Sequence, residues 1–207
     1  MTTTILLIRH ALHAEVGTVL SGRRPGLALS ERGAAQAEQL ARRLAGCGLV
    51  RVETSPLERA RQTAEPIAVA AGLTPQVAPA LNEVDFGAWT GRAFSDLAGD
   101  PLWQRWNADR AVAQTPGGET MAAAQERAWA HCVRTALALP CTTVAMVSHC
   151  DVIRAVLARV LDLSLNRLLS FDLSPASVSR LEVGEHGARV LSINDTAHLE
   201  CAAAEHA

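Results

Sequence analysis

Two arginines, two histidines and one glutamate of this sequence have the chemistry that complements a phosphate group. Arg9 and His10 follow the apolar run ILLI, and His149 follows the apolar run VAMVS. Arg59 lies in SPLERARQTA, and Glu83 lies in LNEVDFGAWTG. The guanidinium fork matches phosphate oxygens, a neutral imidazole is a competent nucleophile toward phosphorus, and a protonated carboxyl group donates to a leaving oxygen. Together these residue types favour phosphoryl transfer at an anion site.

Each feature has an ordinary structural interpretation when it is taken alone. An Arg-His pair after a strand is common at a protein surface, and SPLERARQTA suits an amphipathic helix with a basic face. Glu83 alone suits a loop, and His149 alone suits a buried core. What favours a functional site is that all four motifs occur in this order, each near the end of a predicted strand.

The residues between the motifs predict alternating strands and helices. A buried strand is expected at residues 3–8, further strands at 49–54, 76–78 and 142–148, and a pair of edge strands at 178–183 and 189–193. Helices are expected at residues 31–45, after the N-cap Ser30, and at 56–71, 120–139 and 152–161. Pro66 should kink or break the second of these helices, because proline lacks the N–H group.

This alternation predicts an α/β protein of three layers, α/β/α, in which a mostly parallel sheet carries helices on both faces. One domain is expected over residues 1–207. A helical insertion at about 79–119, with short helices at 94–97 and 102–108, is expected over the active site. Ligands of such sheets bind at the carboxyl ends of the strands. The side chains that follow the strands should therefore converge there.

Five segments together form a family pattern. They are RHA near the N-terminus, LxxxG at 29–33, SPLERARQTA, LNEVDFGAWTG and VSHCDVIRAVL. The sequence resembles the histidine phosphatase superfamily, also called phosphoglycerate mutase-like, over roughly residues 4–160. It departs from the usual RHG at Ala11 and from the usual HG at Cys150. Both replacements are small, so function should survive them, and Cys150 is expected to be a buried thiol rather than an oxidation-sensitive one.

The resemblance implies a role for each of the five residues. His10 would be the nucleophile that forms a phosphohistidine. Arg9 and Arg59 would hold the phosphoryl oxygens, and His149 would complete the phosphate pocket and stabilise charge in the transition state. Glu83 would donate a proton to the leaving group and then act as the base for the attacking water. The residue types agree with these roles, because phosphoryl transfer needs mainly positioning and positive charge.

Candidate substrate-binding residues lie in the loop after the nucleophile and in the insertion. Ser21 and Arg23 lie in VLSGRRPG, where Arg23 or Arg24 either contacts a second anionic group or forms a solvated turn. Glu119, in TPGGET, is a candidate contact from the insertion. The segment Trp103–Trp106 either lines an apolar pocket for the leaving group or packs the core, and packing is favoured.

Three other functions fit these residues less well. A phosphoglycerate mutase-type phosphotransferase would use the same machinery, but the asparagine-bearing segment of mutase-like relatives is missing from this sequence. A non-catalytic phosphate-binding module would be expected to have lost a core residue, and none is lost. A metal site built on His10, His149, Cys150 and Asp151 would have poor ligand spacing, and neighbouring arginines favour an anion. No metal and no cofactor are therefore expected.

Composition limits the partners. The 207 residues have a formal net charge of −2, with four tryptophans, three phenylalanines and no tyrosine, which gives no argument for nucleic acid. The apolar runs are far shorter than a bilayer span, so no membrane association is expected. Five cysteines without a CxxC pair favour the cytoplasm. The expected partner is a small phosphorylated substrate of unreadable identity, bound by a monomer or homodimer.

Overall fold

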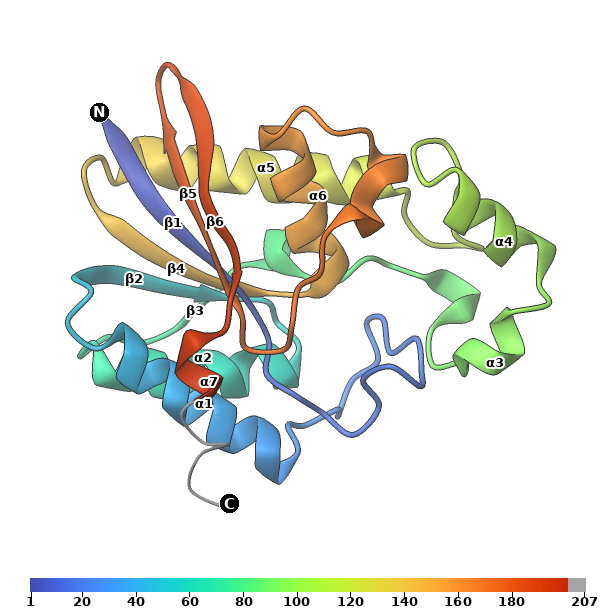
Figure 1. Cartoon of the computed structure of the whole chain (residues 1–207), viewed down its shortest axis with the longest axis horizontal. Helices are drawn as coiled ribbons and strands as arrows, with labels where there is room; N and C mark the ends of the chain where they lie inside the picture. The colour runs from blue at the N-terminus through green and yellow to red at the C-terminus, as the bar shows by residue number, and fades with distance from the viewer. Residues whose placement is uncertain (201–207) are drawn as a thin grey trace.

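The computed structural model describes residues 1–200, and within them six strands form one sheet in the order β3-β2-β4-β1-β5-β6 (Figure 1). The strands are β1 (Thr2–Arg9), β2 (Leu49–Thr54), β3 (Gln76–Val77), β4 (Thr143–Ser148), β5 (Val178–Gly184) and β6 (Gly187–Asp195). The strands from β3 to β1 in this order are parallel, whereas β5 and β6 pair antiparallel. The mostly parallel sheet predicted from the sequence is confirmed.

Helices cover both faces of the sheet, as the α/β/α prediction requires. In Figure 1, α1 (Glu31–Leu44) and α2 (Glu58–Ala70) lie below the sheet, and α5 (Met121–Ala138) and α6 (Cys150–Val160) lie above it. Ser30 caps α1 by accepting the N–H of Gly33, and Thr120 caps α5 by accepting the N–H of Ala123. Within residues 1–200, no helix combines the length and apolar character that a bilayer crossing requires.

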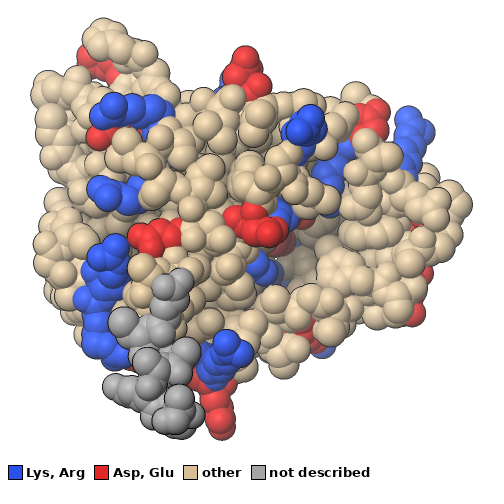
Figure 2. Space-filling model, in the orientation of Figure 1, with Lys and Arg blue, Asp and Glu red and all other residues tan. Residues whose placement is uncertain are grey.

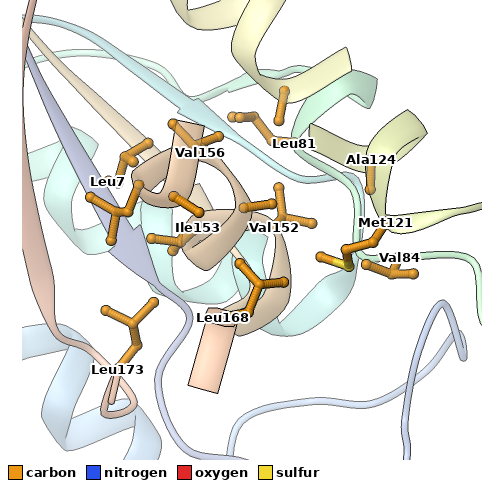
Figure 3. Packing of buried hydrophobic residues seen from close by; sticks show 14 of the residues in the cluster. Leu7, Leu81, Val84, Met121, Ala124, Val152, Ile153, Val156, Leu168 and Leu173 are labelled. Carbon is orange, nitrogen blue, oxygen red and sulfur yellow. The ribbon is translucent and has the colours of Figure 1, made fainter. Parts of the chain in front are cut away.

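Strand β1 is buried on both faces and separates two hydrophobic cores. Ile5 and Leu7 pack into the core under α5 and α6, whereas Leu6 and Ile8 pack into the core under α1 and α2. This split follows from the pleat, which directs successive side chains to opposite faces. Figure 3 shows the first core, in which α6 sends Val152, Ile153 and Val156 against residues of β1, α5 and the insertion. The uninterrupted apolar run ILLI is explained by this two-sided burial.

The insertion between β3 and α5 begins against the sheet, where Leu81 and Val84 join the core, and its short helices then project to the right in Figure 1. It contains two 3-10 turns (Pro79–Leu81 and Gly87–Trp89) and the short helices α3 (Phe94–Leu97) and α4 (Pro101–Ala108). Trp89 and Trp106 are buried, with ring centroids 6.3 Å apart, and Trp103 packs edge-on against Trp89 at 5.3 Å. Trp89 and Trp106 therefore belong to the core under α5 and α6, as the packing interpretation predicted, whereas the partly buried Trp103 also lines a cleft, as the pocket interpretation allowed.

Three details differ from the sequence expectation. Strand β5 is not an edge strand, because β1 pairs with it on one side and β6 on the other. Helix α2 begins at Glu58 rather than Pro56, because Ser55 and Leu57 are still extended or turning. Pro66 lies inside α2 without ending it. The buried residues on its flanks, among them Ala64 and Ile67, hold the helix against the sheet where a backbone hydrogen bond is lost.

Gly33 sits where α1 touches the loop that follows the nucleophile candidate. A Cβ atom at this position would lie 1.9 Å from the carbonyl oxygen of Leu12, which is backbone and cannot rotate away. We expect Gly33→Ala to lower the free energy of unfolding by about 1–3 kcal/mol, measured by urea denaturation. The intrinsic helix preference of alanine predicts the opposite sign. Gly99→Ala, whose Cβ would meet nothing within 4 Å, is the matched control and should be neutral.

Candidate active site

A cleft of about 610 Å³ opens at the carboxyl ends of β1 and β4, between the sheet and the insertion. Figure 2 shows this region as a hollow with arginine side chains in it. Its walls include Arg9, His10, Arg59 and Glu83, which are four of the residues that the sequence singled out. The β1–β4 register pairs Arg9 with Ser148, so the residues that follow, His10 and His149, come together with ring centroids 5.1 Å apart.

His10 is buried, and one of its ring nitrogens is already occupied. Its Nδ1 lies 2.8 Å from the carbonyl oxygen of Ala11. Because a carbonyl only accepts, Nδ1 carries the hydrogen and Nε2 keeps its lone pair. Burial first, and then the charges of Arg59 and Arg9, lower the pKa of His10 well below its ordinary value. The imidazole is therefore neutral near pH 7, with Nε2 free to act as a nucleophile.

Two arginines surround this imidazole and keep unsatisfied donors. Arg59 is 1% exposed, and its Nη2 donates to the Gly22 carbonyl at 2.7 Å. Arg9 donates from Nη1 to the carbonyl of Leu173. Among the residues that the structure describes, Nε of Arg9 and both Nε and Nη1 of Arg59 are buried without a hydrogen-bond partner. Unmade hydrogen bonds of buried charged groups are costly, so an anion with several oxygens would stabilise this cluster.

His149 stands at the N-cap of α6 and is held from both sides. Its Nε2 lies 2.7 Å from the hydroxyl of Ser55, and its Nδ1 lies 3.3 Å from Nη2 of Arg59. Burial and the charge of Arg59 lower its pKa well below the ordinary value, so it is neutral. The N-terminus of α6 adds partial positive charge beside it. Ser55 directly follows β2, so its position after a strand already placed it at this edge of the sheet.

Glu83 is the acid of the cleft. Its Oε2 lies 3.8 Å from Nδ1 of His149, and its Oε1 accepts the N–H of Val84 at 2.9 Å. Burial first, and then the negative charge of Asp151, raise the pKa of Glu83 to about 7. A carboxyl group with this pKa is present in both protonation states near neutral pH. It can therefore give a proton and take one back in the same reaction cycle.

The substrate-side candidates fall in two different places. Ser21 lines the cleft, where its hydroxyl donates to Glu15 at 3.2 Å. Arg23 lies outside the lining, because its donors are taken by the backbone carbonyl of Glu83 at 2.8 Å and by the side chains of Asp85 and Glu119. Its proposed contact with a second anionic group finds no support in these distances.

Glu119 also lies behind the cleft rather than in it. Its carboxylate accepts from Arg23, from the N–H of Asp85 and from Arg127, whose Nη2 lies 2.7 Å away. Arg127 also donates to the carbonyl of Glu83 at 3.1 Å. These contacts fix the backbone that carries the acid. Arg127 was missed by sequence reasoning, because nothing in its position within α5 shows which loop it reaches.

The metal-site alternative has no ligand geometry to support it. Within residues 1–200, no group of three or more His, Cys, Asp or Glu side chains is arranged to hold a metal ion. Cys150 belongs to the wall of the cleft, and burial raises its pKa to about 11. Its thiol is therefore protonated and a poor nucleophile or ligand. The side chain is only partly buried and lines the cleft, so the fully buried position expected for Cys150 is not what the structure shows.

A model of the histidine phosphatase superfamily (branch 1) matches residues 5–196. The chain belongs to this superfamily. Phosphoserine phosphatase 1 of Hydrogenobacter thermophilus is 32% identical over 200 residues, which cover 94% of this chain and 93% of that protein. The bifunctional protein Rv2228c of Mycobacterium tuberculosis is 37% identical over 207 residues, and the match spans 95% of this chain and 55% of that protein. The structure of Bacillus stearothermophilus YhfR superimposes with a TM-score of 0.87 at 25% identity, covering 95% and 99% of the two chains.

The unsatisfied donors of Arg59 predict tight binding of inorganic phosphate. Phosphate at about 100 times its Kd should stabilise the wild type by about 2.7 kcal/mol, seen as a rise in Tm. Arg59→Met should remove most of this rise, measured against the variant's own Tm without phosphate. Arg61→Met, an exposed arginine two residues along the same helix, is the matched control and should keep the full rise. An unchanged phosphate response in Arg59→Met would contradict the assignment.

Proposed function

We propose that this histidine phosphatase superfamily member hydrolyses a phosphomonoester through a phosphohistidine on His10. One observation carries the proposal. The Ala11 carbonyl takes the Nδ1 hydrogen of a buried neutral imidazole, and the remaining Nε2 belongs to a cleft whose arginines have unpaired donors. The relative named a phosphoserine phosphatase, which matches nearly the whole chain, supports the same reaction class.

In the first step, the Nε2 lone pair of His10 forms a bond to phosphorus while the bond from phosphorus to the ester oxygen breaks. Glu83, in its protonated form, gives its proton to the departing oxygen. The donors of Arg9 and Arg59, with the N-terminus of α6, bind the equatorial oxygens as charge spreads over them. The products are an alcohol, a phosphohistidine and an ionised Glu83.

In the second step, a water molecule takes the place of the alcohol. Ionised Glu83 removes a proton from this water as its oxygen bonds to phosphorus and the bond to Nε2 breaks. Inorganic phosphate leaves, His10 is neutral again, and Glu83 is again protonated. A pKa of about 7 suits this double role, because neither protonation state is strongly disfavoured near neutral pH.

The nucleophile is tested by phosphate release from an aryl phosphate in the presence of EDTA. The wild type should be active, and His10→Ala should lose activity by at least about 10³-fold, since the covalent route is closed. When the phosphoryl group of the aryl phosphate is radiolabelled, an acid-labile label should be trapped on the wild-type protein and not on the His10→Ala variant. His186→Ala, in the exposed β5–β6 turn, is the matched histidine control and should retain full activity. Interconversion of phosphoglycerates without phosphate release would instead favour the mutase alternative.

The acid is tested by the pH dependence of kcat/KM with an alkyl phosphate, whose poor leaving group needs a proton. The donor works only when it is protonated, so kcat/KM should fall about tenfold per pH unit above a pH of about 7. Asp151→Asn removes a negative charge that raises the pKa of Glu83, so the fall should begin at lower pH. Glu83→Gln should abolish this fall of kcat/KM at high pH and lower kcat/KM by about 10²–10⁴-fold. If kcat/KM of Glu83→Gln still falls above a pH of about 7, the titrating group is another residue.

A further inference from the structure

A third imidazole lies in the wall of the cleft, beside the nucleophile candidate. His13 is 5% exposed and lines the cleft. Its ring stacks on the ring of His10, with the two centroids 5.2 Å apart and the two planes at 30°. His10 therefore has an imidazole neighbour on each side, His13 and His149. The two-step reaction described above assigns no role to His13.

Backbone groups fix opposite tautomers in the two stacked rings. The N–H of Glu15 donates to Nδ1 of His13 at 3.3 Å, so this Nδ1 uses its lone pair and carries no hydrogen. Burial first, and then the charge of Arg59, lower the pKa of His13 to about 4. The ring is therefore neutral near pH 7, and its single hydrogen is on Nε2. In His10, the Ala11 carbonyl takes the Nδ1 hydrogen and leaves the Nε2 lone pair free. One ring is thus a nucleophile, and its neighbour is a hydrogen-bond donor.

The Nε2–H group of His13 is free and open to the cleft. It makes no hydrogen bond to any of residues 1–200, and it is not among the polar atoms that are sealed from solvent without a partner. Because the ring lines the cleft, the solvent at this N–H group is that of the cleft. The loop around it is held by Glu15, whose carboxylate accepts from Ser21 at 3.2 Å and from Arg24 at 2.7 Å. The donor is therefore in place before a ligand binds.

An in-line transfer to His10 brings phosphoryl oxygens toward this donor. The three equatorial oxygens spread at right angles to the line from Nε2 of His10 to phosphorus. Because they are spaced evenly around that line, one of them must point toward the face of the His10 ring that His13 covers. An N–H group already positioned on that face can bind this oxygen without any rearrangement.

We propose that His13 is a further catalytic residue, whose Nε2–H group donates a hydrogen bond to an equatorial oxygen of the phosphoryl group during its transfer to and from His10. The inference rests on the proposed function, since it adds a donor to the same reaction. No proton moves in this role. The hydrogen stays on Nε2 of His13 and stabilises the negative charge of the oxygen that accepts it.

Two substitutions that separate the donor from the ring test this inference by aryl phosphate hydrolysis. His13→Phe keeps a ring to stack on His10 but has no donor, whereas His13→Gln loses the ring but keeps an N–H group near the position of Nε2. We expect kcat/KM to fall about 10- to 100-fold in His13→Phe and less than about threefold in His13→Gln, as for a hydrogen bond to a charged group. His186→Phe, the same substitution in the exposed β5–β6 turn, is the matched control and should keep full activity.

NMR of the wild type gives a second test that depends on no variant. With isotope-labelled histidine, the nitrogen resonances should place the hydrogen of His13 on Nε2 and that of His10 on Nδ1. Inorganic phosphate should shift the Nε2–H resonance of His13 downfield, as expected for a new hydrogen bond. A hydrogen on Nδ1 of His13, or a resonance that phosphate leaves unchanged, would overturn the inference.

Each other outcome with the two variants also overturns the inference. A loss in His13→Gln but not in His13→Phe would assign the effect to ring stacking, and equal losses would make His13 a support of the cleft wall. No loss in either variant would place the phosphoryl group beyond its reach. The proposed function is judged separately by comparing the wild type with His10→Ala. If that comparison supports the phosphohistidine and His13→Phe keeps full activity, only this inference is defeated.

Discussion

Arg59 is a guanidinium group that is 1% exposed and, among the described residues, has no ion pair within 4 Å. The other features of the cleft depend on this buried charge. Burial lowers the pKa of both His10 and His149, and the charge of Arg59 lowers it further, so that both imidazoles stay neutral beside it. A protonated His10 could not attack phosphorus, and a buried carboxylate in place of the missing partner would repel a phosphate. The site is thus held ready for an anion by leaving a cation unneutralised.

The sheet holds these charged groups in place, because two hydrophobic cores fix the elements that carry them. The parallel pairing of β1 with β4 brings His10 beside His149, and the N–H of His10 donates to the carbonyl of Ser148 at 2.9 Å. Helix α2 packs its alanine-rich face, including Ala60 and Ala64, against the sheet and so delivers Arg59 from below. The geometry at the strand ends is therefore set by apolar packing on both faces rather than by attraction among the polar groups.

The residues of the cleft come from two parts of the fold, the sheet edge and the insertion. The sheet edge supplies the groups that would handle the phosphoryl group. The insertion supplies Glu83, the proposed proton donor, and Arg110 to the wall of the cleft. Behind Glu83, the charged cluster of Arg23, Glu119 and Arg127 holds the loop backbone through the Glu83 carbonyl. Burial raises the pKa of this acid and the charges of Arg59 and Arg127 partly oppose the rise, so the pKa depends on the position in which the cluster holds the loop.

The sequence by itself determined the elements of the sheet, the convergence of Arg9, His10, Arg59, Glu83 and His149, and the family. These follow from local signals: hydrophobic period, capping residues and motifs at strand ends. The tertiary structure alone decided which loop arginine lines the cleft. Arg23 and Arg110 are both charged loop residues in the sequence, and only their distant partners separate them. Glu119 lies 96 positions from Arg23 and occupies its donors, whereas no residue among those described satisfies Nε of Arg110. Spacing along a chain carries no information about such long-range partners, and so only the fold shows which of these arginines belongs to the cleft wall.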